Sequence, residues 1–384
     1  MKMLTAFTYE LDDPQLAVEE LLEQLQLDQN LEQHSAGLVT CYPEFLENGI
    51  VAALAKALPF DLVGCTTLGN ATSGNSGTMM LALTVLTGDK LRFSSVCSAP
   101  LADDLGGSMA EACKTALAAL DGEPVLALVF LPMINDLGGE QMLEPLNAAL
   151  PGVPLFGTMA CSENIGMEYA ETIYNGAAAK EALTMLLVSG LEDLHFVVSS
   201  IPQDSFQKQR AVITGSQGNL LQTVNDLSFL AYMNTLGLTQ GDGIEGLQSI
   251  PFLVDYNDGT QPVAKAIYLV TPEGYASCTG VMPEQSTLAI GAIDDRYVLK
   301  SAEEVLTGIL ETGGRNGLLM FPCLSRNMVL GLNALAELEL AIDLIGDRLP
   351  YHLCYSGGEV CPVPRHSAEL VNRFHAFTVV ACIF

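Results

Sequence analysis

Two short segments near the end of the sequence hold the residue types best suited to chemistry. They are 321–326 (Phe-Pro-Cys-Leu-Ser-Arg) and 354–360 (Cys-Tyr-Ser-Gly-Gly-Glu-Val). Together they supply a thiol, hydroxyl groups, a guanidinium, two glycines and a carboxylate. Such groups could hold a small zwitterion, with the ligand's carboxylate on Arg326 and its ammonium on Glu359. The Gly357-Gly358 backbone could approach that ligand closely, because no side chain intervenes.

Three other interpretations use the same residues. An Arg326–Glu359 salt bridge could simply hold the two segments together, and the glycine pair could be only a turn. Alternatively, Arg326 could lower the pKa of Cys323 and make it a nucleophile. That enzyme would also need a base, for which His352 and His375 are the nearby options. We expect ligand binding without catalysis, and no catalytic residue is assigned.

The elements around these segments predict how they are positioned. Apolar runs typical of buried strands precede them, at 318–321 and 351–355, and an amphipathic helix is predicted over 333–345. A strand–helix–strand unit of this length favours parallel strands joined by a right-handed crossover. Both segments would then lie at the carboxyl edge of one sheet, where open α/β sheets bind ligands.

The same order of elements occurs three times along the chain. The first copy has strands at 37–41 and 61–67 around a helix at 44–58, and the second has strands at 125–131 and 154–158 around a helix at 140–150. Gly64 and Gly157 hold equivalent places in these copies. If the copies face each other, the turns after their strands would line one cleft with Arg326 and Glu359. The predicted ligand-binding set is Cys323, Arg326, Ser356, Gly357, Gly358, Glu359, Gly64, Cys65, Thr66, Thr67 and His375.

The segment between the second and third copies is less regular. A polar stretch at 205–218 is the candidate connection between two domains. After it, we predict a helix over 220–238, strands at 265–270, 276–279 and 287–293, and a helix over 302–310. The prediction is an α/β protein of two domains, with mixed β-sheets, flanking helices and internally duplicated β-α-β-β units.

Composition restricts the classes of partner. The chain has 384 residues, of which 49% are hydrophobic and 16% charged, so a large core is possible. With 16 Lys+Arg against 45 Asp+Glu, the net charge is −29. Such a surface repels phosphate backbones and anionic lipid, so nucleic acid is not an expected partner. No apolar run approaches the roughly 18 residues that span a bilayer, so membrane insertion is not expected either.

The cysteines indicate a reducing compartment. The sequence contains 10 cysteines, and its first residues lack the apolar core of a secretory signal. We therefore expect reduced thiols in a cytoplasmic protein. Most of them stand in apolar or small-residue contexts typical of core positions. Their spacing does not match a zinc site, so no metal site is predicted.

The order of these motifs resembles the FIST family, whose N-terminal and C-terminal domains occur in bacterial signal transduction. The N-terminal resemblance depends on a helix at 17–25 and on 62–69 (Leu-Val-Gly-Cys-Thr-Thr-Leu-Gly). The C-terminal resemblance depends on 231–237 (Ala-Tyr-Met-Asn-Thr-Leu-Gly) and on the two segments described first. The resemblance covers nearly the whole chain and implies a FIST N-terminal-like domain over 1–215 and a FIST C-terminal-like domain over 216–384.

This resemblance implies a stand-alone sensory protein that binds a small ligand, such as an amino acid or related metabolite, and acts through a separate partner. It also implies an alternative, because some family members are haem proteins that sense nitric oxide and regulate a histidine kinase. Non-covalent haem needs one axial ligand and an apolar pocket. His195 and His375 are the histidines in apolar strands. The expected protein binds no cofactor, with haem kept as the alternative.

Overall fold

Three six-stranded sheets and one eight-stranded sheet form the computed structural model, which describes all residues except 135–136, 164–166, 200–209, 240–249, 315 and 366–368. In the first sheet the strand order is β1 (Lys2–Thr8), β6 (Leu81–Gly88), β2 (His34–Cys41), β3 (Leu62–Thr66), β10 (Thr172–Tyr174) and β11 (Ala177–Ala179). In the second it is β25 (Glu369–His375), β24 (Glu359–Arg365), β9 (Leu155–Met159), β8 (Leu126–Leu131), β12 (Thr184–Ser189) and β7 (Arg92–Cys97). In the third it is β13 (His195–Ser199), β26 (Val379–Ile383), β22 (Leu318–Pro322), β23 (Tyr351–Cys354), β4 (Asn70–Thr72) and β5 (Asn75–Gly77).

These three sheets share one plan, which confirms the predicted repeat of β-α-β-β units. Each has one parallel pair, β2–β3, β8–β9 or β22–β23, and the remaining neighbours are antiparallel. Val39 pairs with Gly64 and Val129 with Gly157, so the two glycines are structurally equivalent. A Cβ atom would lie 1.7 Å from the Val39 carbonyl oxygen at Gly64 and 1.8 Å from that of Val129 at Gly157. Only glycine fits such close approaches of two strands.

The three copies are called the first, second and third lobe, and they contain the parallel pairs β2–β3, β8–β9 and β22–β23. Each lobe contributes a hairpin to the sheet of another lobe. The hairpin β4–β5, which follows β3, joins the third sheet, where Ala71 pairs with Leu353. The hairpin β10–β11, which follows β9, joins the first sheet. The hairpin β24–β25, which follows β23, joins the second sheet, where Glu359 pairs with Thr158. Each lobe therefore completes the sheet of another, and strands from before and after the expected boundary at 215–216 share two of the sheets.

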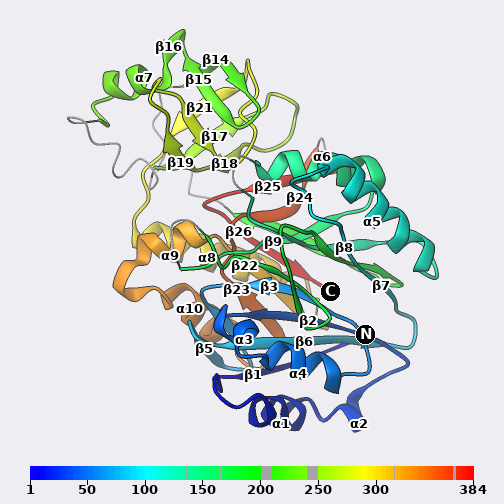
Figure 1. The fold of residues 1–384 in the computed structure, drawn as a ribbon. Helices are drawn as coiled ribbons and strands as arrows, with labels where there is room; N and C mark the ends of the chain where they lie inside the picture. Colours follow the sequence, from blue (N-terminus) through cyan, green and yellow to red (C-terminus); the bar gives the residue numbers. More distant parts are fainter. Residues whose placement is uncertain (135–136, 164–166, 200–209, 240–249, 315, 366–368) are drawn as a thin grey trace.

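Helices cover the outer face of each of these sheets (Figure 1). The first sheet carries α1 (Pro14–Leu25), α2 (Leu27–Asn30), α3 (Glu44–Glu47) and α4 (Ile50–Ala57). The second carries α5 (Leu105–Ala119) and α6 (Gly139–Ala149), and the third carries α8 (Asp295–Glu311), α9 (Leu324–Leu330), a 3-10 turn (Gly331–Asn333) and α10 (Ala336–Ile345). Their amphipathic faces form three outer cores with the sheets, as the helical spacing of apolar residues requires.

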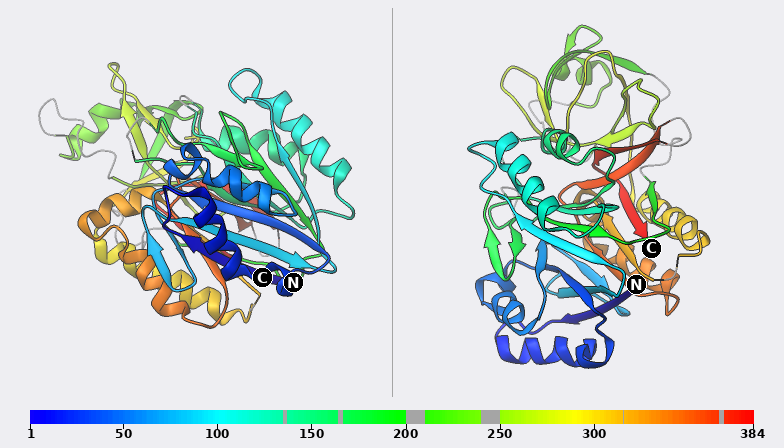
Figure 2. Two further views of the ribbon diagram at one scale, coloured as in Figure 1. Left: turned by 60° about the horizontal axis from the view of Figure 1, so that its bottom comes forward. Right: turned by 90° about the vertical axis from the view of Figure 1, so that its right-hand side faces the viewer.

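A central core joins the inner faces of the three sheets. Leu38 comes from the first sheet, and the stacked rings of Phe156 and Phe321 come from the second and third, with ring centroids 5.1 Å apart. Cys65 and Cys354 are buried in the same core, as free thiols. The chain termini lie side by side on one side of this three-lobed body (Figure 2).

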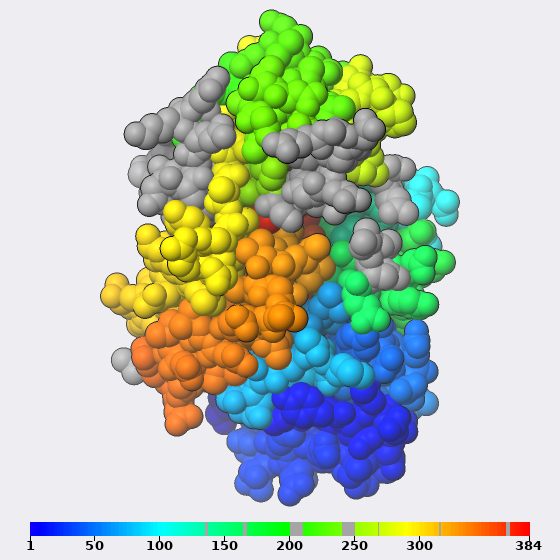
Figure 3. All heavy atoms as spheres, turned by 90° about the vertical axis from the view of Figure 1, so that its left-hand side faces the viewer, coloured from blue at the N-terminus to red at the C-terminus, as the bar shows by residue number. Residues whose placement is uncertain are grey.

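The eight-stranded sheet forms a separate β unit, residues 211–290, at the end of the molecule opposite α1 and α2 (Figures 1 and 3). Its strands are β18 (Val263–Lys265), β17 (Phe252–Asp255), β21 (Thr287–Ile290), β14 (Ala211–Gln217), β15 (Leu220–Val224), β20 (Ala276–Cys278) and β19 (Ile267–Val270), with β16 (Leu227–Ser228) beside β15 and helix α7 (Phe229–Thr235). It has a core of its own. The predicted division at 215–216 falls within β14 and stays a prediction as a domain boundary.

Two predictions about this unit need correction. The helix expected over 220–238 is wrong in its first half, where β15, a turn and β16 precede the short α7. Asn225 and Asp226 have φ of 49° and 62°, the left-handed conformations that a tight hairpin turn requires. Similarly, the single strand expected over 265–270 is divided into β18 and β19. Part of the predicted connection, 205–209, lies outside the described residues.

Across the described residues, none of the helices combines the length and the apolar composition that a membrane span needs. The same residues contain no group of three or more His, Cys, Asp or Glu arranged to hold a metal ion.

Candidate functional site

The three turns that follow the second strand of each parallel pair meet at one junction. The amide of Cys161 donates to the Thr66 carbonyl at 3.1 Å, and the Thr67 hydroxyl donates to the Tyr355 carbonyl at 2.6 Å. The amide of Gly357 donates to the Met159 carbonyl at 2.9 Å. The turns predicted to line one cleft therefore lie together as packed backbone, with almost all of their residues buried, and their role as a ligand cleft stays a prediction.

Several predicted site residues have structural partners within this junction. Ser356 closes its own turn, since its hydroxyl donates to the Gly358 carbonyl and accepts from the Gly358 amide. A Cβ atom at Gly358 would lie 2.0 Å from the ring of Phe374, so packing against that ring requires glycine there. Thr66 bonds to the backbone of 169 and 171, and Cys65 points into the central core. Their role in ligand binding stays a prediction.

Arg326 does not form the alternative salt bridge with Glu359. It lies in α9 rather than in a turn, and its guanidinium pairs with Glu337 of α10 at 2.6 Å, with both side chains fully buried. Further bonds go to the Ser301 hydroxyl and to the carbonyls of Val298 and Phe377. Burial raises the pKa of Glu337, and Arg326 opposes that rise. The guanidinium is thus almost fully used in joining α8, α9 and α10.

Sequence reasoning missed Glu337, although a signal was present. The buried residues of α10 are Glu337, Leu338, Ala341 and Ile345, so the carboxylate occupies a position of the apolar helical face. A charged residue in such a position is rarely buried without a partner. Arg326 is that partner.

Glu359 has a different environment. Its side chain is fully buried, and its Oε2 atom accepts a hydrogen bond from the Thr378 hydroxyl at 2.6 Å. Its Oε1 atom has no hydrogen-bond partner among the described residues. Burial raises the pKa of Glu359 to about 8, against the opposing effects of Thr378 and the Cys323 thiol. Burial therefore favours the protonated form of this carboxyl group.

Cys323 lies beside Glu359 as a buried thiol. Burial and the Glu359 charge raise its pKa well above the ordinary value, which favours the thiol over the thiolate. The two candidate bases bond elsewhere: His352 to the hydroxyls of Thr40 and Thr84, and His375 to the Cys361 carbonyl at 3.1 Å. Burial also lowers the pKa of His352 to about 4 and of His375 to about 3. Of the predicted set, Cys323, Glu359, His375 and the 356–358 turn are brought together here.

Lys265 of the β unit is the functional candidate that sequence reasoning missed at this junction. It is fully buried, forms an ion pair with Glu140 at the start of α6, and donates to the Phe374 carbonyl at 2.7 Å. Burial lowers its pKa well below the ordinary value, while the nearby Glu359 opposes that effect. Lys265 stands in an apolar run of the sequence, and its only signal was that a lone lysine there needs a partner.

The turn between β25 and β26 connects these groups. Phe377 has a φ of 56°, a left-handed conformation that is rare for a bulky side chain. Its ring packs in one cluster with Cys323 and with Leu253, Ala264 and Ala289 of the β unit. The β unit therefore rests on the segment that also carries Thr378, the partner of Glu359. Strained backbone of this kind is concentrated at functional sites.

The two histidines considered for haem do not suit that group in this arrangement. His375 is enclosed, and its Nε2 atom is bonded to the Cys361 carbonyl. His195 is exposed and lines a cavity of about 760 Å³. That cavity is also lined by Glu32, Asp89, Glu192 and Asp193, whereas a haem face requires apolar walls.

Two models of known protein families together match most of the chain. The FIST N domain model matches residues 35–227, and the FIST C domain model matches residues 223–362. The chain belongs to the FIST family. FIST domains are generally sensory domains of signal transduction, which is the class that the resemblance implied. The FIST N match contains the 64–67 turn, and the FIST C match contains Lys265, Cys323, Arg326 and Glu359.

Other comparisons are more distant. No curated protein sequence matches this FIST chain. Among solved structures, it is similar to the cyanuric acid hydrolase from A. caulinodans, at 12% identity and a TM-score of 0.39, over 100% of this chain and 98% of that one. A second cyanuric acid hydrolase structure, described as an evolutionary innovation by structural concatenation, is 11% identical with a TM-score of 0.38, over 100% of this chain and 98% of that one.

Proposed function

We propose that this chain is a small-ligand-binding sensory protein of bacterial signal transduction, which binds an amino acid or related metabolite at Glu359 and acts through a separate partner. Glu359 carries the proposal, because its buried Oε1 atom has no hydrogen-bond partner in the described part of the chain. An unsatisfied buried carboxyl oxygen costs about 1–3 kcal/mol, so its retention calls for a functional reason.

The chemistry of Glu359 fits the ammonium group of an amino acid. An ammonium donates to the free oxygen and favours the ionised carboxylate, so ligand binding would release the proton that burial keeps on Glu359. Arg326 cannot readily take the ligand's carboxylate, since its donors are engaged by Glu337, Ser301 and two carbonyls. Lys265 also lies near Glu359, but its amino group is held by Glu140 and the Phe374 carbonyl, so the ligand's carboxylate would have to displace one of these partners.

The position of the site suggests how binding is signalled. Glu359, Thr378 and Cys323 are enclosed beneath the contact between Phe377 and the β unit. A ligand reaches Glu359 only if this contact opens, and its presence would change how the β unit packs on the body. That change in packing is what a partner, such as a histidine kinase, would recognise.

A thermal-shift screen tests the proposal. Amino acids, dicarboxylates and haemin are added to the wild type, to Glu359→Gln and to Glu303→Gln, which makes the same chemical change at an exposed site on α8. We expect an amino-acid class of ligand to raise the melting temperature of the wild type and of Glu303→Gln but not of Glu359→Gln. Equal shifts in all three proteins, or a shift with haemin alone, would contradict it.

A further inference from the structure

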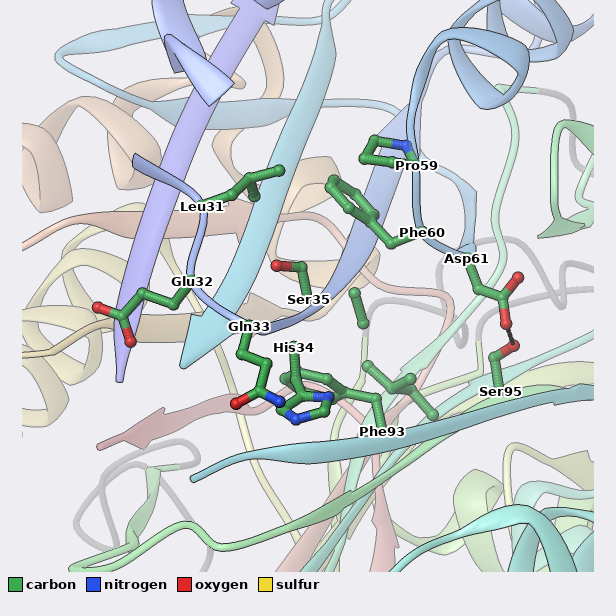
Figure 4. Close-up of a pocket in the computed structure, with 12 residues that line it drawn as sticks. Leu31, Glu32, Gln33, His34, Ser35, Pro59, Phe60, Asp61, Phe93 and Ser95 are labelled. Carbon is green, nitrogen blue, oxygen red and sulfur yellow. Dashed lines mark hydrogen bonds between the residues drawn. The ribbon is translucent and has the colours of Figure 1, made fainter. Parts of the chain in front are cut away.

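A polar pocket opens between the first and second sheets, at the end of β3 remote from Glu359 (Figure 4). Its volume is about 500 Å³, within the usual range for small-molecule sites. The walls come from the segments that lead into β2 and β3 and from β7 and β12. The residues that line it include Glu32, His34, Phe60, Asp61, Phe93 and Ser95.

The side chains that line this pocket include acidic residues without any lysine or arginine. Its acidic lining residues are Glu32 and Asp61. Glu32 pairs with the exposed Lys2 at 3.3 Å. Asp61 has no ion-pair partner among the described residues, and its hydrogen bonds come from neutral donors, the Ser95 hydroxyl at 2.6 Å and the Asn175 amide at 3.0 Å. These donors orient the carboxylate and leave its charge uncompensated.

Phenylalanine and leucine side chains are among the apolar residues that line the pocket. Phe60 and Phe93 lie on its two sides in Figure 4, and Leu186 is a further apolar lining residue. The Nε2 atom of His34 is enclosed and has no hydrogen-bond partner in the described part of the chain. A carboxylate beside aromatic rings is the combination that attracts organic cations.

The threefold repeat gives an independent reason to single out Asp61. In the first lobe the Gly37 amide donates to the Asp61 carbonyl at 2.9 Å. The equivalent hydrogen bonds of the second and third lobes, each 3.0 Å long, end on the carbonyls of Pro154 and Pro350. Proline suits the first residue of a strand. The fold therefore does not need a carboxylate at this place, and only the lobe with the pocket has one.

We propose that this pocket binds a small organic cation, with its ammonium group on Asp61 and its apolar part against Phe60 and Phe93. Ser95 belongs to β7 of the second sheet, and Asn175 to the hairpin that the second lobe contributes to the first sheet. A cation on Asp61 would thus bind where the first and second lobes meet. This site is separate from Glu359, so it goes beyond the function proposed above.

Three probes of similar shape and different charge test this inference by titration calorimetry: benzylamine, benzyl alcohol and benzoate. We expect benzylamine to bind the wild type with a Kd on the order of 1 mM, and the other two to bind more weakly by about tenfold or not at all. Asp61→Asn, which keeps an acceptor for Ser95, should weaken benzylamine by about tenfold. Asp103→Asn, the same change at an exposed residue, should leave it unchanged.

A second variant addresses the possibility that Asp61→Asn perturbs folding. Gln33 is an exposed lining residue, and Gln33→Lys brings a competing cation to the pocket without removing any buried contact. We expect it to weaken benzylamine while the circular dichroism spectrum and melting temperature stay those of the wild type. Benzylamine that fails to bind, that binds no better than benzoate, or that binds all variants equally would overturn the proposal.

Discussion

Arg326 and Glu359 are both fully buried in the third lobe, yet their surroundings are opposite. Arg326 has a carboxylate, a hydroxyl and two carbonyls as partners, whereas Glu359 has one hydroxyl and one free oxygen. The buried Arg326–Glu337 ion pair joins two helices, although Oε2 of Glu337 has no hydrogen-bond partner among the described residues. A half-satisfied group lowers stability and remains available to a ligand. The comparison separates a residue that holds the site together from one that can bind.

The two groups are connected through a single turn. Arg326 donates to the Phe377 carbonyl at 3.3 Å, and the next residue, Thr378, donates to Glu359. The hydrogen bond from Arg326 thus helps to hold Phe377 in its left-handed conformation, while the ring of Phe377 contacts the β unit. Strain at Phe377 is offset by the Arg326 cluster, so the two regions have different roles in one structure.

The largest expected effect is that of breaking the Arg326 cluster. Arg326→Met leaves Glu337 buried without a counter-charge and should lower the free energy of unfolding by about 3–5 kcal/mol, measured by urea denaturation. Arg296→Met, which removes an exposed ion pair with Asp294, serves as the control and should leave the midpoint unchanged. Adding Glu337→Leu should recover much of the loss. If Arg326→Met is as stable as the wild type, the structural role assigned to Arg326 is wrong.

The next effect concerns the pH dependence of Glu359. Burial raises its pKa in the folded state to about 8, while the ordinary value in the unfolded state is 4.5. Between these values the folded state keeps a proton that the unfolded state has lost, so this group lowers stability progressively as pH rises. Glu359→Gln should therefore gain stability relative to the wild type, by on the order of a few kcal/mol between about pH 5 and about pH 8.

Urea denaturation of both proteins at a series of pH values measures this difference. His352, whose pKa burial also lowers, bonds to Thr40 and Thr84 rather than to Glu359, so its contribution is common to both proteins. Parallel pH profiles for the wild type and Glu359→Gln would show that the carboxyl group is not held protonated.

The smallest expected effect is that of removing the Cys323 thiol beside Glu359. Cys323→Ala removes a buried sulfur and the weak donor beside Glu359, and should cost about 1 kcal/mol at neutral pH. In a Glu359→Gln background the cost should differ, because the two side chains interact. Cys113→Ala, at a buried apolar site on α5, should cost the same in both backgrounds. Equal costs of Cys323→Ala in the two backgrounds would contradict the predicted coupling.

Local patterns predicted much of the fold and part of the site. Strands before and after the helix of each copy, and the equivalence of Gly64 and Gly157, follow from hydrophobic spacing that acts within about 30 residues. The first half of the helix expected over 220–238 was wrong, because the Asn225-Asp226 turn outweighed a helical spacing of apolar residues. The partners Glu337 and Lys265 were not predicted, since nothing in a local pattern indicates which charge meets which.

The sequence by itself determined the α/β class, the three strand–helix–strand units, and the residue types at the ends of their strands, because these depend on periodicity and turn chemistry. Only the tertiary structure decided that the hairpins pass from lobe to lobe, as in the pairing of Ala71 with Leu353. It also decided that Arg326 meets Glu337 and that Glu359 keeps a free oxygen. Whether a buried charge is satisfied depends on groups distant in sequence, and only packing brings these together.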